Sequence, residues 1–188
     1  MLTAGDERTR QIVARAQDGD REAFNVLATS VVDRLYAVAR LILRDTDQAE
    51  DAVQETLIRC WRDLPSLRDP ARFDAWINRI LVHAVADSHR RYRRQPANVR
   101  LLPTDPSTPD ETDAVALREQ LGRAFSHLSV EHRTIVVLRF YLELSVEATG
   151  TALGIPPGTV KSRLHYATEA LRAALEADAR PLVQEAFS

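Results

Sequence analysis

The chain has 188 residues, of which 45% are hydrophobic and 28% are charged, and its formal net charge is −2. This composition is typical of a soluble globular protein with one large or two small domains. No apolar run approaches the roughly 20 residues that a membrane-spanning helix needs, and residues 1–17 lack the pattern of a signal peptide. We therefore expect a cytoplasmic protein without membrane insertion. Its one cysteine, Cys60, cannot form an internal disulfide and is expected to be buried.

Residues 1–94 are predicted to form a first helical domain, because apolar residues recur there at three- and four-residue spacing. Asp20 is expected to cap the second of its helices, and Asp45 or Asp47 the third. The predicted helices cover residues 7–17, about 21–43, about 45–64 and about 71–94. The exposed face of the last of these helices is predicted to carry Arg79, Val82, His83, Asp87, Arg90 and Arg94.

Residues 95–112 are predicted to be a flexible linker rich in Pro and Asp. Four of the nine prolines lie there, and no apolar periodicity survives. The sign of the charge changes along this part of the chain. Residues 89–100 contain five arginines and no acid, whereas residues 105–113 contain four acids and no base.

Residues 113–188 are predicted to form a second helical domain that contains a helix-turn-helix. Its first two helices are expected over residues 113–125 and 130–142, the second capped by Ser129 and directing Tyr141 inward. Predicted helices over about 146–153 and from Pro157 to about Ala179 complete the domain. The fold class is therefore all-α, with two small helical domains and a linker between them.

The helix-turn-helix prediction rests on its turn residues. Ser145 is a candidate N-cap, Gly154 suits the left-handed position after a helix, and Pro157 suits the first turn of the next helix. In that next helix, apolar residues recur at spacings of 4, 3 and 4 from Val160 to Leu171, and polar residues occupy the other faces. In this geometry the second helix enters the DNA major groove.

Two separate blocks resemble one protein family. The run LGIPPGTVKSRL, residues 153–164, closely resembles the C-terminal DNA-binding region of bacterial sigma factors of the extracytoplasmic-function (ECF) group. Residues 20–24 (DREAF), 49–56 (AEDAVQET) and 73–80 (FDAWINRI), together with Trp61, resemble the N-terminal domain of the same group. The resemblance implies a dissociable subunit of RNA polymerase that reads the promoter −35 element and opens the −10 element.

The resemblance also implies three sets of site residues. The first would bind core RNA polymerase at the clamp of the largest subunit, with the flap as a second contact: Asp51, Gln54 and Glu55. The second would hold −10 DNA: Ser66, Arg68, Arg79, His83, Asp87, Arg90, Arg91 and Arg94. The third would contact −35 DNA: Gly158, Thr159, Lys161, Ser162, Arg163, His165 and Tyr166. An anti-sigma factor is a further implied partner.

Solvent-exposed helix faces would have much the same composition, so that interpretation stays open for the carboxylates around Asp51 and for the arginines near Arg94. Asp87 is unusual in a phosphate-facing site, and it is expected to cap the helix, to pair with an arginine or to accept from a base. Cations along a helix, with polar groups between them, are what single-stranded DNA binding requires.

The chain departs from the family at several positions. Asn is usual where His83 stands, Glu-Ile-Ala is frequent at residues 148–150, and Arg is common at the positions of Tyr166 and Thr168. Gly150 within a helix is expected to cost ~1 kcal/mol relative to Ala. These departures leave an alternative open, namely a sigma-like decoy that binds an anti-sigma factor without productive DNA recognition.

A stand-alone repressor is a second alternative, but it would not explain the first domain, and an enzyme is a third. The five histidines have no metal-ligand spacing with Cys60 or with carboxylates, and the chain has no Gly-rich phosphate loop and no nucleophile elbow. We therefore predict no catalytic residue, no metal and no cofactor.

Overall fold

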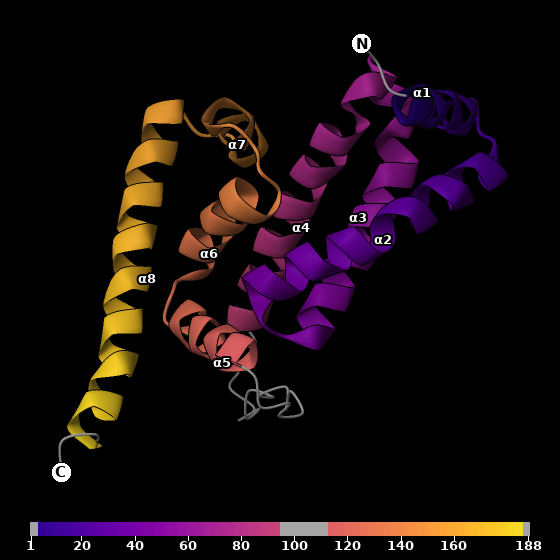
Figure 1. Cartoon of the computed structure of the whole chain (residues 1–188). Coiled ribbons are helices and arrows are strands. Elements are labelled where there is room, and N and C mark those ends of the chain that lie inside the picture. The colour runs from indigo at the N-terminus through magenta and orange to yellow at the C-terminus, as the bar shows by residue number, and fades with distance from the viewer. Residues whose placement is uncertain (1–3, 95–112, 186–188) are drawn as a thin grey trace. The chain divides into compact units, whose positions relative to one another are not determined.

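The structure is a computed structural model that describes residues 4–94 and 113–185. Within those residues every regular element is helical (Figure 1), which confirms the all-α prediction. The helices are α1 (Ala4–Gln17), α2 (Arg21–Leu43), α3 (Thr46–Asp63), α4 (Phe73–Arg94), α5 (Asp113–Ser126), α6 (Val130–Val136), α7 (Val146–Leu153) and α8 (Pro157–Glu185). The chain divides into two compact units, residues 1–100 with 151–154 and residues 101–150 with 155–188. The predicted linker, residues 95–112, lies outside the described residues.

The first unit is built from α1 to α4, with the short 3₁₀ turns η1 (Leu64–Ser66) and η2 (Pro70–Arg72) between α3 and α4. Both predicted caps are confirmed. The Asp20 carboxylate accepts from the backbone N–H groups of Glu22 and Ala23, and Asp45 accepts from that of Gln48. These bonds satisfy amides that have no partner inside the helix.

The core of the first unit lies between α2, α3 and α4. Its largest fully buried side chains include Leu35, Ile42, Phe73, Ile77 and Leu81. Val82 is buried as well, with 6% of its surface exposed, so its prediction as an exposed residue was wrong. Because α4 packs against both α2 and α3, its buried face is wider than the stripe that the sequence indicates.

Cys60 is buried, as expected, and burial raises the pKa of its thiol to about 12, with Asp63 adding to the rise. A thiol held neutral in this way packs as a small apolar group and is a poor nucleophile. The neighbouring Trp61 is 41% exposed and packs edge-on against Phe24, with ring centroids 4.7 Å apart.

The second unit is built from α5, α6, α8 and the first part of α7, since residues 151–154 fall in the first unit. Ser129 caps α6 as predicted, since its hydroxyl accepts from the His132 N–H. The predicted helix over residues 130–142 is wrong at its end, because the α-helix stops at Val136 and continues as a π-helical turn, η3 (Val137–Tyr141). The wider turn changes the direction of the following side chains, and Tyr141, which was expected inward, is 50% exposed.

Local hydrogen bonds close this π-helical turn. The Leu142 N–H donates to the Val137 carbonyl and the Leu144 N–H to the Leu138 carbonyl, both at 3.0 Å. The Arg139 guanidinium donates to the Leu144 carbonyl, immediately before α7. The π-helical turn thus sets the start of the helix-turn-helix.

The helix-turn-helix has the predicted local structure. The Ser145 hydroxyl accepts from the Ala148 N–H at 3.0 Å, Gly154 has a φ of +67°, and Pro157 is the first residue of α8. Val160 and Ala167 are fully buried. The predicted end of the last helix near Ala179 is wrong, since α8 continues to Glu185 and includes Pro181, although proline has a low helix propensity.

Candidate promoter-DNA and polymerase surfaces

The three predicted polymerase-binding residues share one side of α3. Asp51 and Gln54 are exposed, and Glu55 is partly buried. Their spacing of three and four residues places them on consecutive turns. Glu55 is not solvated on all sides, however, because its Oε1 accepts from Arg59 Nε at 2.6 Å.

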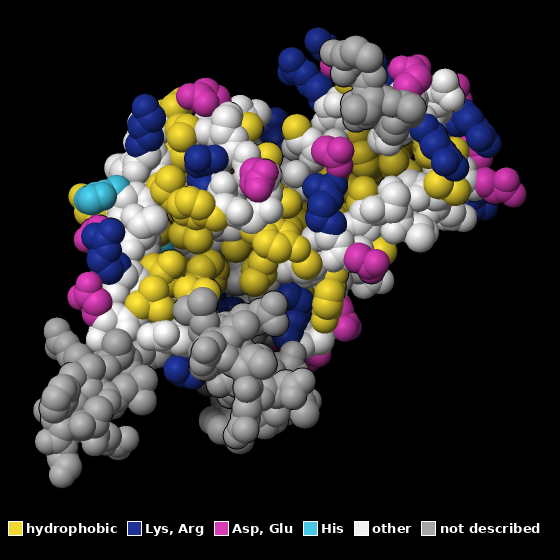
Figure 2. Space-filling model, in the orientation of Figure 1, with side chains coloured by type: hydrophobic (Ala, Val, Ile, Leu, Met, Phe, Trp, Pro, Cys, Tyr) yellow, Lys and Arg dark blue, Asp and Glu magenta, His cyan; other side chains and the backbone are white. Residues whose placement is uncertain are grey.

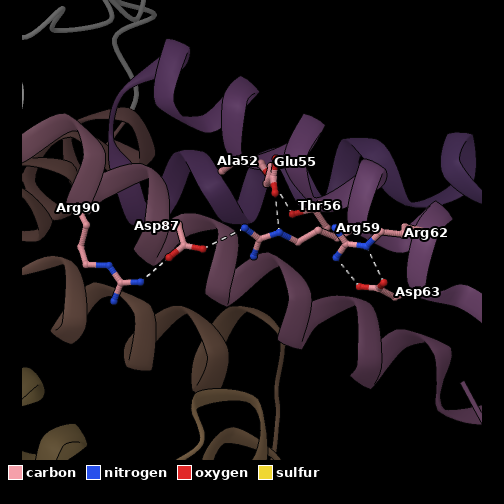
Figure 3. Close-up of polar contacts among 8 residues, drawn as sticks. All are labelled: Ala52, Glu55, Thr56, Arg59, Arg62, Asp63, Asp87 and Arg90. Atoms are coloured by element: carbon pink, nitrogen blue, oxygen red, sulfur yellow. Dashed lines mark hydrogen bonds and ion pairs between the residues drawn. The ribbon is translucent and has the colours of Figure 1, made fainter. Parts of the chain in front are cut away.

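Arg59 also bonds to a residue of α4, and it therefore links Glu55 to that helix (Figure 3). Its Nη2 donates to Asp87 Oδ2 at 3.0 Å, and the other Asp87 oxygen accepts from Arg90. Glu55, Arg59, Asp87 and Arg90 therefore form an alternating series of charges, which we call the α3–α4 ion chain. It joins a predicted polymerase contact to two predicted −10 contacts.

The ion chain explains the unusual aspartate. Burial would raise the pKa of Asp87, but hydrogen bonds from Arg59 and Arg90 outweigh it and lower the pKa below the ordinary value of 3.8. Of the three roles expected for Asp87, the structure shows pairing with arginine. Sequence analysis missed Arg59, although its place four residues after Glu55 is the spacing of a helical ion pair.

The predicted −10 residues of α4 lie along one face of that helix. Arg79 and His83 are exposed, and Asp87, Arg90, Arg91 and Arg94 line one open pocket at its C-terminal end. Three arginines around one neutralised carboxylate give this end of α4 an excess of positive charge. Such a surface suits a nucleic-acid backbone.

Ser66 and Arg68 lie in the turn between α3 and α4, and both are exposed. Leu64, which precedes Ser66, and Leu67, which lies between Ser66 and Arg68, both point inward. Leu64 is 1% exposed and Leu67 is 8% exposed. Sequence analysis also missed Gln17, whose side-chain amide donates to the carbonyls of both leucines. No sequence signal reveals this contact, because it spans about 50 residues of chain.

The predicted −35 residues follow the exposed side of α8. Gly158, Lys161, Ser162, His165 and Tyr166 are exposed, whereas Thr159 and Arg163 are partly buried. Tyr166 is 64% exposed and lies against His165, with ring centroids 5.6 Å apart. Figure 2 shows basic, histidine and acidic side chains following one another along α8. Side chains of these kinds are suited to phosphate contacts and to base-edge contacts in DNA.

Two other kinds of site are absent from the described ranges. No group of His, Cys, Asp and Glu there has an arrangement that holds a metal ion. None of the described helices combines the length and the apolar character that a membrane crossing requires.

The short α7, the turn at Gly154 and the start of α8 together define a helix-turn-helix, which is a motif of DNA-binding proteins. Comparison with known proteins agrees with a DNA-binding role for this motif. The family model for sigma-70 region 2 matches residues 27–95, and that for sigma-70 region 4 matches residues 124–173.

Individual relatives point the same way. The ECF RNA polymerase sigma factor SigL of Mycobacterium tuberculosis is 39% identical over 146 residues, which cover 76% of this chain and 82% of SigL. The structure of CnrH in complex with the cytosolic domain of CnrY has a TM-score of 0.64 and 26% identity, covering 90% of this chain and 98% of CnrH. The sigma factor RpoE in complex with the anti-sigma factor NepR, from Bartonella quintana, has a TM-score of 0.63 and 25% identity, covering 82% of this chain and 98% of RpoE.

The chain belongs to the ECF group of RNA polymerase sigma factors, which direct promoter-specific initiation of transcription.

Proposed function

We propose that the two units of this sigma factor divide promoter recognition between them. The first domain, residues 1–94, docks on the clamp of core polymerase through Asp51, Gln54 and Glu55 and holds the melted −10 strand. The second, residues 113–188, reads the −35 element with α8 and also contacts the polymerase flap. Residues 95–112 join them as a flexible linker.

The α3–α4 ion chain is the observation that supports this proposal most strongly. It places a carboxylate side of α3 next to the arginine-rich end of α4, with Arg59 in contact with both. A basic polymerase surface and an acidic DNA strand can therefore bind the same small unit on adjacent, oppositely charged faces.

The protein acts by binding and not by catalysis in this proposal, and it works in the cytoplasm with the polymerase. An anti-sigma factor is its proposed regulator. The support for that partner is the similarity to RpoE, whose structure is a complex with the anti-sigma factor NepR.

Charge reversal tests the polymerase surface. Asp51→Lys is expected to weaken core polymerase binding by roughly tenfold, because it places a cation against a basic partner surface. Asp33→Lys makes the same charge change at an exposed position of α2 and is expected to bind core as the unaltered protein does. Equal binding by all three proteins in a titration with labelled chain would contradict the assignment of this face.

A further inference from the structure

Gln17, the last residue of α1, connects this helix to the turn between α3 and α4. Its Nε2 donates to the Leu64 carbonyl at 3.0 Å and to the Leu67 carbonyl at 2.6 Å. Both protons of one side-chain amide are thus used on two carbonyls of the same turn. Gln17 lies before residues 27–95, the segment that the region 2 family model matches.

The end of α1 holds Gln17 in place. The Gly19 N–H donates to the Ala16 carbonyl and the Asp20 N–H donates to the Arg15 carbonyl, both at 3.1 Å, and Gly19 has a φ of +89°. This is the bonding pattern of a helix closed by a left-handed glycine. The Arg15 guanidinium also pairs with the Asp20 carboxylate at 2.6 Å.

The two bonds from Gln17 act on the part of the turn that carries the predicted DNA contacts. Leu64 and Leu67 direct their side chains into the core, and the Leu67 N–H donates to the Leu64 carbonyl at 3.0 Å. Gln17 therefore fixes the backbone on both sides of Ser66 and immediately before Arg68. Both of these side chains remain exposed.

We propose that Gln17 is a positioning residue for −10 recognition, which it serves by holding the turn that presents Ser66 and Arg68 to the melted strand. The inference rests on the proposed −10 role of that turn. A turn that is already held in place before DNA binds loses little conformational freedom on binding. Its affinity for bases is therefore higher. Without the amide, the turn samples other conformations and discriminates less between bases.

A purely structural role makes a different prediction. If the amide only ties α1 to the rest of the unit, its loss lowers stability and weakens every activity of the unit together. If it positions the turn, its loss weakens single-strand capture and blurs base preference, while binding to core polymerase is retained.

The test compares Gln17→Met with Gln11→Met in the full chain bound to core polymerase. Methionine keeps the length of glutamine and removes both donors, and Gln11 is an exposed residue of the same helix. The probe is a pool of single-stranded DNA oligonucleotides with randomised bases, with affinity and selected sequences as readouts. We expect Gln17→Met to bind roughly five- to tenfold more weakly and with a flatter base preference. Gln11→Met should match the unaltered chain, and core affinity should be the same for all three.

The outcomes separate the inference from its premise. If Arg68→Ala weakens oligonucleotide binding and Gln17→Met leaves affinity and base preference unchanged, the positioning role is wrong and the proposed −10 surface stands. If neither variant has an effect, the turn is not part of the DNA site. The positioning role of Gln17 and the proposed −10 role of the turn are then both wrong. Equal loss of core binding and oligonucleotide binding by Gln17→Met would show a structural role alone.

Discussion

Thr149 holds a buried hydroxyl at the heart of the helix-turn-helix. Its side chain is fully buried, and its Oγ1 has no hydrogen-bond partner among the described residues. A buried polar atom in that state costs free energy that an apolar group of the same shape does not.

Thr149→Val is therefore expected to raise the free energy of unfolding by about 1 kcal/mol. Denaturant unfolding measures this change. Thr134→Val is the matched control, because the Thr134 hydroxyl donates to the Val130 carbonyl at 2.7 Å and its removal should give no gain. An equal or larger gain at Thr134 would contradict the argument.

Asp87 makes stability depend on pH in acid. Its pKa is lowered in the folded protein, so the ionised carboxylate contributes stability above its ordinary pKa of 3.8 and this stability is lost as the pH falls through the folded value. Asp87→Asn removes the contribution, which is about 1 kcal/mol or less for a pair at the surface.

We expect the difference in unfolding free energy between Asp87→Asn and the unaltered chain to shrink as the pH is lowered from 7 to about 3. Urea titrations at several pH values measure it, with Asp33→Asn as the control for the change in net charge. A difference that is constant over this range would show that the ion chain does not set the titration of Asp87.

At the scale of elements, the turn between α7 and α8 explains Gly150. A Cβ at this position would lie 2.8 Å from the Ile155 carbonyl oxygen and 3.5 Å from Val160 Cγ2. Glycine in this helix costs ~1 kcal/mol in helix propensity. It also allows the backbone at Ile155 to approach the helix closely, which a side chain at position 150 would prevent.

Gly150→Ala is expected to lower the free energy of unfolding by about 1–3 kcal/mol despite the better helix propensity, because backbone must shift to admit the methyl group. Gly122→Ala in α5 is the control. A Cβ there meets nothing within 4 Å, and the substitution should stabilise by about 0.5–1 kcal/mol. Stabilisation at both positions in thermal unfolding would overturn this account of the turn.

Local features of the elements could be predicted from the sequence. The caps at Asp20, Ser129 and Ser145 and the turn at Gly154 depend on a few neighbouring residues, and all were confirmed. The π-helical turn was not predictable from periodicity, because apolar spacing does not distinguish a single π-helical turn from the α-helix that precedes it.

The candidate site likewise has a part that the sequence predicted and a part that it did not. Sequence motifs indicated the faces of α3, α4 and α8, because each face is a simple helical repeat. The contacts that organise these faces join residues distant in the chain, and neither the bond of Arg59 to Asp87 nor that of Gln17 to the turn follows from a pattern. Which bases the faces read stays a prediction.

At the scale of the whole molecule, the proposed function assigns a different promoter element to each of two small helical units. The formal net charge of −2 gives no general attraction to DNA, so under this proposal DNA binding depends on where the arginines lie and on the polymerase that the chain binds. Arg163 on α8 and His83 on α4 represent the two proposed reading surfaces.

In vitro transcription from a genomic promoter library with core polymerase tests this division most directly. We expect starts that share two upstream motifs, with Arg163→Ala altering the preferred −35 motif and His83→Asn the preferred −10 motif, each without changing the other. Core binding without specific starts would favour the decoy alternative. Specific starts whose two motifs change together in either variant would contradict the assignment of one reading surface to each unit.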